Sequence, residues 1–176
     1  MRRQIKRLMG HLTSHDSSAP VRPRLVDVTS KSPTARLAVA EATLLVASAA
    51  GPPSAWWPAA GSSAETALMA TASVAGVGAA KRTSSLIPLC HPLPLDGADV
   101  AVGRPAAAAA GGWGVTVTAS VRTTQRTGVE MEALAAAAVG ALTLYDMLKG
   151  GVAQQCLEVG GVRVLKKSGG KRDFAR

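Results

Sequence analysis

The sequence predicts an α+β fold, in which long helices pack on one face of an antiparallel sheet. Apolar residues recur at helical spacing near 33–49, 62–83 and 127–148, and they alternate with polar residues over 115–122. These helices and strands do not alternate regularly along the chain, which favours an antiparallel sheet over a parallel one. A chain of 176 residues suffices for one domain with a single core.

The composition limits the kinds of ligand and compartment. Aromatic residues make up only 3% of the chain, so the core must consist of Ala, Val and Leu. Twenty Lys and Arg against eleven Asp and Glu give a net charge of +9, which favours anionic ligands. The cysteines, Cys90 and Cys156, are too few for a disulfide framework and indicate a reducing compartment. No uninterrupted apolar run reaches about 20 residues, so a soluble protein is expected.

Residues 1–23 are expected to form a mobile basic segment, and residues 24–176 a single domain. The first twelve residues contain four Lys and Arg and no acidic residue. This pattern is compatible with an organellar transit segment and equally with a frayed basic terminus. We therefore expect a cytoplasmic protein, with the mitochondrial matrix as the alternative in a eukaryote.

Start signals place the three expected helices. Ser32-Pro33 is typical of a helix start and predicts a helix over 33–49. Ser62 and Glu65 have capping-box spacing, which predicts a second helix that runs to about residue 83. Thr127 and Glu130 repeat that spacing and predict an Ala-rich helix that ends before the glycine pair 150–151.

Strands and connections are expected to fill the rest of the chain. The predicted strands are 25–29, 99–102, 115–122 and a last pair around 157–165. The predicted connections are a Pro- and Trp-containing loop at 51–63, a low-complexity hairpin connection at 103–112 and a basic glycine turn at 167–171.

Four segments combine special backbone residues with clustered charge. They are LVDVTSK (25–31), AAKRT with LIPLCHPL (79–83 and 86–93), TGVEMEAL with YDMLK (127–134 and 145–149), and KSGGK (167–171). In content, order and approximate spacing, these strings closely resemble the molybdenum cofactor biosynthesis protein C family over about residues 24–174.

The resemblance implies a ferredoxin-like fold, dimers assembled into a hexamer, and an active site shared between protomers. It also implies a lyase that converts 3′,8-cyclo-7,8-dihydro-GTP into cyclic pyranopterin monophosphate and pyrophosphate. No cofactor and no protein-bound metal are implied, and a Mg²⁺ ion that accompanies the triphosphate stays open. Neither a membrane nor nucleic acid is an expected partner.

The family's functional positions fall on charged residues and their neighbours. The catalytic set that the resemblance implies is Lys149, Asp146, Lys167, His91 and Glu132. The implied substrate-binding set is Glu130, Lys81, Arg82, Arg36, Cys90, Pro92 and Met131. Judged from its apolar neighbours alone, Cys90 is better explained as a core thiol.

The carboxylates and the histidine of these sets also have simpler interpretations. His91 alone in an apolar run would be a structural histidine, whereas histidine in general is the side chain suited to proton exchange at neutral pH. Glu130 could be the third residue of a capping box. Because side chains two residues apart on a helix diverge, Glu132 is the better catalytic candidate of the two.

Helix geometry separates Glu132 from the pair Asp146 and Lys149. This pair lies three residues apart on one helix face, either as an exposed ion pair worth under about 1 kcal/mol or as a catalytic lysine with its tuning carboxylate. Asp146 follows Glu132 by fourteen residues, roughly 21 Å along a helix. An antiparallel copy of the helix would bring the two together, which predicts a site built by two protomers.

The glycine turn and residue 65 complete the charged pattern. The turn at 167–171 lacks the spacing of a nucleotide-hydrolase phosphate loop, so we expect a basic flap over a triphosphate. The family usually has a lysine where this chain has Glu65. We favour a position for Glu65 at the mouth of the pocket over a purely capping role.

Two alternatives to an active lyase follow from these patterns. Because Glu65 replaces a lysine that is usual in the family, the first alternative is a weakly active paralogue that binds nucleotide or assembles with an active homologue. Because the net charge is strongly positive, the second alternative is a nucleic-acid-binding protein. Against the second, the chain lacks aromatic stacking platforms and carries much of its basic charge at its termini.

Overall fold

The structure, a computed structural model, describes residues 12–13, 22–170 and 172–176. Most of the predicted basic segment 1–23 lies outside these residues. Within it, β1 (Leu12–Thr13) pairs with β2 (Arg22–Pro23) in a short antiparallel ladder.

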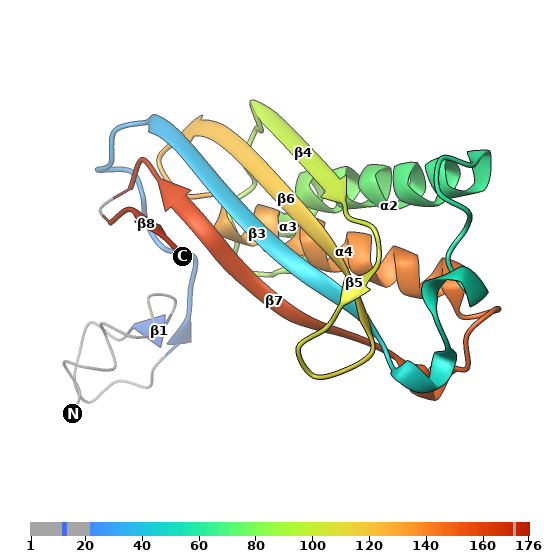
Figure 1. Ribbon diagram of the computed structural model, residues 1–176. Helices are drawn as coiled ribbons and strands as arrows, with labels where there is room; N and C mark the ends of the chain where they lie inside the picture. The colour runs from blue at the N-terminus through green and yellow to red at the C-terminus, as the bar shows by residue number, and fades with distance from the viewer. Residues whose placement is uncertain (1–11, 14–21, 171) are drawn as a thin grey trace.

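An antiparallel sheet runs the length of the molecule (Figure 1). The strand order is β4–β6–β3–β7–β8, and β5 pairs with β6 at the edge. The strands are β3 (Thr34–Val46), β4 (Gly97–Val102), β5 (Ala106–Ala107), β6 (Trp113–Gln125), β7 (Leu157–Ser168) and β8 (Phe174–Ala175). The strand patterns predicted at 99–102 and 115–122 are therefore confirmed, and the second strand is longer than expected.

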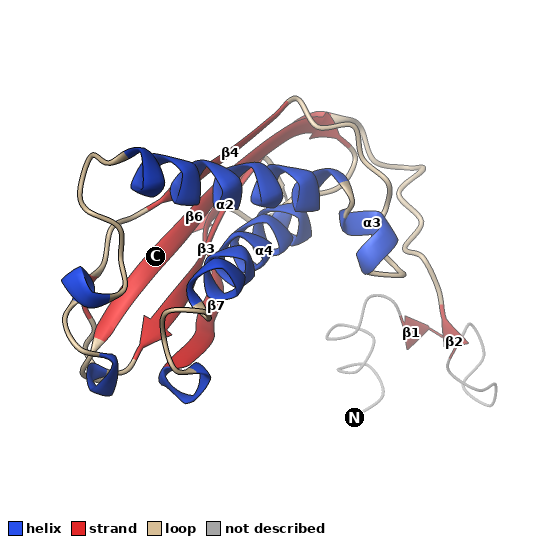
Figure 2. Ribbon diagram, turned by 90° about the vertical axis from the view of Figure 1, so that its right-hand side faces the viewer, coloured by secondary structure: helices blue, strands red, loops and turns tan. Residues whose placement is uncertain are grey.

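The helices cover one face of this sheet, as Figure 2 shows. They are α2 (Ser63–Lys81), the single turn α3 (Thr83–Leu86) and α4 (Glu130–Leu148). Short 3-10 turns occur at Ser48–Ala50, Pro53–Ala55 and Gln154–Cys156. The chain order β3–α2–β4–β6–α4–β7, with β3 and β6 in the centre of the sheet, is the ferredoxin-like arrangement that was expected.

The predicted helix over 33–49 is wrong, because this segment is the central strand β3. Its side chains alternate in burial, and Ala38, Ala40, Ala42, Leu44 and Val46 all point into the core. Alanine and leucine favour helices in isolation, but β3 pairs with β6 on one side and with β7 on the other. These long-range pairings override the local helix propensity.

Three smaller expectations also differ from the structure. Residues 25–28 are irregular rather than a strand, and a turn follows. The N-cap of α4 is Val129 and no side chain caps it, so the Thr127 capping box does not form. The last strand pair is one long strand, β7, with irregular pairing to β3, and its partner is the two-residue β8.

Small residues let α2 and α4 pack closely on each other and on the sheet. A Cβ atom on Gly76 would lie 2.8 Å from the carbonyl oxygen of Ala136, and one on Gly140 would lie 2.8 Å from Val117 Cγ1. The buried core consists mainly of Ala, Val and Leu, as predicted, with two tryptophans, Trp56 and Trp57, at one end.

Helix α4 is long and apolar enough, by length and composition alone, to cross a membrane. Glu132, Gly140 and Asp146 interrupt its apolar residues, so this finding does not contradict the expectation that no uninterrupted apolar run reaches about 20 residues. Its alanine face is buried against β3, β6, β7 and α2, which is the environment of a core helix.

Candidate functional site

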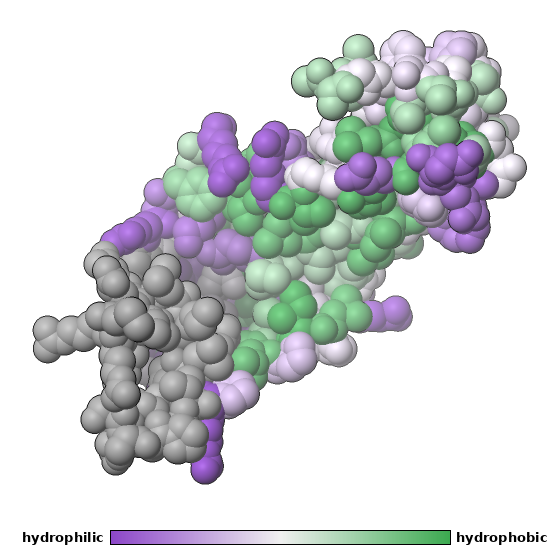
Figure 3. All heavy atoms as spheres, turned by 90° about the horizontal axis from the view of Figure 1, so that it is seen from below, coloured by the Kyte–Doolittle hydropathy of each residue, from purple (hydrophilic) through white to green (hydrophobic). Residues whose placement is uncertain are grey.

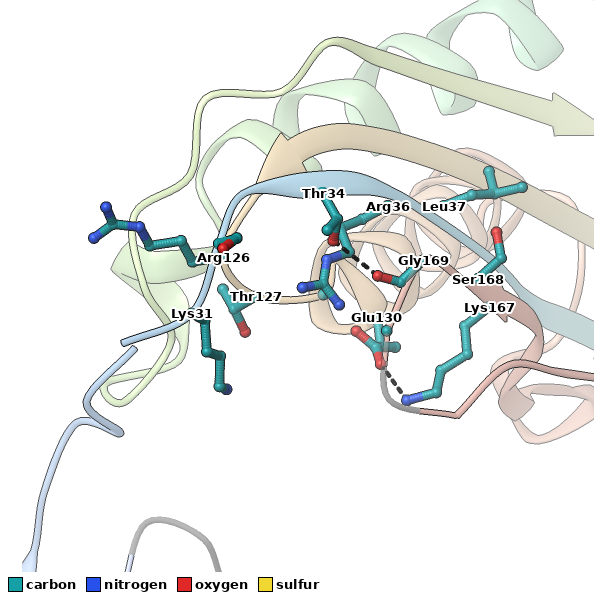
Figure 4. Close-up of a pocket in the computed structure, with 13 residues that line it drawn as sticks. Lys31, Thr34, Arg36, Leu37, Arg126, Thr127, Glu130, Lys167, Ser168 and Gly169 are labelled. Atoms are coloured by element: carbon teal, nitrogen blue, oxygen red, sulfur yellow. Dashed lines mark hydrogen bonds and ion pairs between the residues drawn. The ribbon is translucent and has the colours of Figure 1, made fainter. Parts of the chain in front are cut away.

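A cavity of about 430 Å³ lies at the end of the sheet where β3 begins and β7 ends. Figure 4 shows its charged lining, which comes from three separate parts of the chain. Lys31 and Arg36 come from the connection before β3 and from its first residues, Arg126 and Glu130 from the connection before α4 and its first turn, and Lys167 from the end of β7. Fold topology thus gathers residues that are more than a hundred positions apart in the sequence.

Hydrogen bonds fix the walls of this cavity. Lys167 Nζ donates to Glu130 Oε1 at 2.8 Å, and Arg36 Nε donates to the carbonyl oxygen of Gln125 at 3.3 Å. Thr34 Oγ1 donates to the carbonyl oxygen of Gly169 at 2.9 Å, which ties the glycine turn to β3. The guanidinium group of Arg36 is therefore held in position beside the cavity.

The electrostatics of this cavity favour an anion. Four basic side chains and one carboxylate are among its described lining residues. Burial by itself would raise the pKa of Glu130, but the hydrogen bond from Lys167 and the charges of Lys167 and Arg36 outweigh it and lower that pKa. Glu130 thus stays charged and neutralises only one of the four cations.

A second cavity, of about 330 Å³, adjoins the first and shares Lys31 and Glu130 with it. Its lining adds Cys90, His91, Met131 and Glu132. The structure therefore brings together His91, Glu132, Glu130, Lys167 and Arg36, all of which were predicted from sequence.

His91 holds the segment before β3 in place. Its Nε2 lies 2.8 Å from the carbonyl oxygen of Val26. Because a carbonyl oxygen only accepts, His91 donates the proton on Nε2 in this contact, and Nδ1 takes no part in it. The sequence had predicted a strand at residues 25–29. The contact with His91 explains why residues 25–28 are irregular instead.

Glu132 is the most buried carboxylate of the site, with only 4% of its surface exposed. Burial raises the pKa of Glu132, and the neighbouring charge of Glu130 raises it further. Burial and the charge of Glu132 also raise the pKa of the Cys90 thiol, so Cys90 stays a protonated wall residue. The pKa of Glu130 is thus lowered, while the pKa of Glu132, two residues further along the chain, is raised.

Asp146 and Lys149 lie at the opposite end of the molecule, where α4 ends (Figure 1). Lys149 Nζ donates to Asp146 Oδ1 at 2.5 Å, and this hydrogen bond raises the pKa of Lys149. Both side chains are largely exposed, at 47% for Lys149 and 69% for Asp146. Within one chain, this pair does not meet Glu132 or Lys167.

The remaining predicted residues are more scattered. Lys81 lines a separate cavity of about 320 Å³ beside the start of β4. Arg82 is exposed between α2 and α3, and Pro92 is exposed next to His91. Sequence reasoning gave no role to Lys31 or Arg126, although Lys31 ends the matched string LVDVTSK and Arg126 directly precedes TGVEMEAL.

Glu65 lines neither of the two adjoining cavities, so its position at the mouth of a substrate pocket stays a prediction for a site that two protomers share. Only 3% of its surface is exposed. Its carboxylate accepts hydrogen bonds from Trp57 Nε1 at 2.9 Å, from the backbone of Gly61 at 2.7 Å and from Arg104 at 2.8 and 2.9 Å. These contacts, that of Arg104 foremost, lower its pKa to about 2.

The capping pattern at α2 is half formed. Ser62 Oγ accepts from the backbone N–H of Glu65 at 3.1 Å, as a capping box requires. The Glu65 side chain reaches Gly61 rather than the backbone of Ser62. Across the described ranges, no cluster of three or more His, Cys, Asp or Glu has the arrangement of a metal site.

Comparisons with known proteins identify the family and several relatives of this chain. The model of the MoaC family matches residues 25–170. Cyclic pyranopterin monophosphate synthase of Deinococcus radiodurans is 46% identical over 149 residues, which cover 85% of this chain and 82% of the relative. Cyclic pyranopterin monophosphate synthase 2 of Mycobacterium tuberculosis H37Rv is 44% identical over 170 residues, 93% of this chain and 89% of the relative. The Xanthomonas campestris strain B100 synthase is 43% identical over 153 residues, covering 86% and 87%.

Proposed function

Because the chain belongs to the MoaC family, we propose that it is a lyase of molybdenum cofactor biosynthesis. The proposed reaction converts 3′,8-cyclo-7,8-dihydro-GTP into cyclic pyranopterin monophosphate and pyrophosphate. The family match over residues 25–170 is the observation that carries this proposal. The adjoining cavities with their excess of basic side chains support it independently, since the substrate carries a triphosphate.

The basic cavity suits the phosphate groups of this substrate. Lys31, Arg36, Arg126 and Lys167 supply cations from four directions. Such fixed cations stabilise negative charge that grows on the pyrophosphate group as its bond to the α-phosphorus breaks. The glycine turn after Lys167 adds backbone close to the same space.

The second cavity suits the proton transfers of the ring rearrangement. A substrate hydroxyl forms a new bond to the α-phosphorus, pyrophosphate leaves, and the hydroxyl proton must pass to a base. Glu132 and His91 face the same cavity, and the raised pKa of Glu132 brings that carboxyl closer to neutral pH. We assign proton transfer to these two residues.

The proposal also includes a homo-oligomer, a hexamer built from dimers, in which two protomers share each site. Asp146 and Lys149 have exposed side chains, while the cavities lie at the other end of α4. Large apolar side chains are exposed on both helices, among them Val74, Leu142 and Met147. Hydrophobic surface also covers the middle of the face in Figure 3. Such exposed apolar surface is typical of subunit contacts.

A product assay tests the proposed reaction. Purified protein incubated with 3′,8-cyclo-7,8-dihydro-GTP should release pyrophosphate and form the cyclic pterin phosphate in equal amounts. Parallel reactions with Mg²⁺ and with a chelator show whether a metal ion must accompany the triphosphate. Intact substrate after long incubation in both would overturn the lyase and favour a nucleotide-binding paralogue.

A further inference from the structure

Glu65 and Arg104 form a pair in which one partner is buried and the other is exposed. Arg104 Nε and Nη2 each donate to one oxygen of Glu65, at 2.9 and 2.8 Å. The Arg104 side chain is 60% exposed, whereas Glu65 is 3% exposed. The carboxylate thus lies behind the guanidinium group, and the positive partner is the one that meets solvent.

The surroundings of Glu65 make this orientation rigid. Trp57 and the backbone of Gly61 donate to the same carboxylate, so Glu65 is held by donors from two separate parts of the chain, the connection before α2 and the connection after β4. A bidentate pair uses only one edge of a guanidinium group, and Nη1 takes no part in it. The guanidinium group of Arg104 is therefore exposed and held in a fixed orientation. Its Nη1 group can still donate hydrogen bonds to a further anion.

Arg104 lies at the same end of the protomer as Asp146 and Lys149. Gly76 packs against Ala136 and Gly140 against Ala72, so α2 and α4 run antiparallel, with the start of α2 at the end of α4. Figure 1 shows the start of α2, the connection after β4 and the end of α4 together at this end. The two basic cavities lie at the other end.

We propose that Arg104, oriented by Glu65, is an additional binding residue for the substrate, contacting a phosphate oxygen of the cyclic GTP derivative in the site that a partner protomer completes. This inference rests on the proposed function and on its shared site. It gives Glu65 the role of a positioning residue. An acid at position 65 then does not repel the substrate, since its charge is already paired and shielded by Arg104.

The test compares Arg104→Ala with the matched variant Arg163→Ala in the full-length protein. Arg163 forms a similar pair with Glu41, at 2.6 Å, and its side chain is 56% exposed. Substrate affinity is measured by equilibrium binding, and KM and kcat by pyrophosphate release. We expect Arg104→Ala to raise Kd and KM about tenfold, with a smaller salt dependence, because one phosphate contact is lost. Arg163→Ala should stay within about twofold of wild type.

A double variant separates substrate binding from simple support of the fold. Arg104→Ala leaves a buried carboxylate unpaired, which alone would disturb the structure. Glu65→Gln/Arg104→Ala removes that charge and should recover the melting temperature lost in the single variant, while KM stays high. Recovery of KM together with stability would overturn the inference, as would an Arg104→Ala variant with unchanged Kd. If the wild-type protein binds the substrate but does not turn it over, the lyase proposal fails, and the Kd comparison still decides the role of Arg104. If the wild-type protein does not bind the substrate, both the lyase proposal and the role of Arg104 are overturned.

Discussion

Glu130 and Glu132 show how the environment of a single residue sets its chemistry. Both lie in the first turn of α4 and line the same cavity. Lys167 holds Glu130 in its charged form, whereas burial pushes the pKa of Glu132 upward. Neighbouring carboxyls with separated pKa values are suited to different tasks, one to charge balance and the other to proton transfer.

Glu132→Gln should lower kcat about a hundredfold with little loss of stability. Glutamine keeps the shape of the side chain and removes the transferable proton, and a general acid or base contributes on that scale. Burial already disfavours the charged carboxylate, so the neutral amide fits the site. The check is kcat together with the melting temperature, with exposed Glu158→Gln as control; equal kcat in both variants would contradict the assignment.

Glu65 should make stability depend on pH in the acid range. Its pKa is about 2 in the folded protein against an ordinary value of 4.5. A lowered folded pKa gives stability that is fully present above about pH 4.5 and is lost as the pH falls toward 2. Wild type should therefore melt higher than Glu65→Gln at pH 7, and more than half of that free-energy difference should vanish by about pH 3.

Melting curves of the two proteins from pH 7 to pH 2.5 measure this difference. The other carboxyls titrate in both proteins, so their contributions cancel. A gap in unfolding free energy that stays constant over the whole range would show that Glu65 is not held as a charged group.

At the scale of whole elements, the sequence was informative where local signals decide the structure. Ser62 starts α2 as predicted, and the glycines at 150–151 follow the end of α4. Strand β3 was misassigned because its identity depends on β6 and β7, which local spacing does not reveal. Local sequence patterns were therefore sufficient to predict α2 and α4, whereas β3 can be assigned only from its pairing with the other strands of the sheet.

The same distinction applies to the site. The charged residues could be predicted from matched strings, and their division between the two ends of α4 from helix geometry alone. The partners of Glu65 could not, because Arg104 lies 39 residues away in a low-complexity connection with no pattern that points to it.

The glycine turn after β7 is the element on which the basic cavity most depends. Gly169 has a φ of +85°, and a Cβ there would lie 1.7 Å from the carbonyl oxygen of Ala35. Gly169→Ala should therefore cost about 1–3 kcal/mol and raise KM as the turn moves away from β3. Gly150→Ala, where a Cβ meets no atom within 4 Å, is the control. Chemical denaturation and KM measure both effects; a Gly169→Ala variant that matches wild type in both would contradict this close approach.

At the scale of the whole molecule, α4 separates two sets of charged residues that the proposed function assigns to one substrate site. Glu130 and Glu132 open the helix, and Asp146 and Lys149 end it, roughly 21 Å away. A substrate of nucleotide size cannot contact both sets within one protomer. A partner that presents its own end of α4 to the cavities would solve this problem, and two such sites would form by symmetry.

Mixing two inactive variants tests this shared site directly. Lys167→Ala removes a cation from the cavity end, and Lys149→Ala changes only the opposite end. Each variant alone should lose at least about a hundredfold in turnover, because a charge aimed at a reacting phosphate is worth several kcal/mol. The two variants are mixed in equal amounts, unfolded together and refolded. Half of the protomers then keep an intact cavity end, and the other half keep an intact end at Asp146 and Lys149. Random pairing then gives about a quarter of the wild-type activity, because that fraction of sites combines two intact halves. Each variant refolded alone is the control, and a mixture that stays as inactive as its components would place all the reacting residues within one protomer.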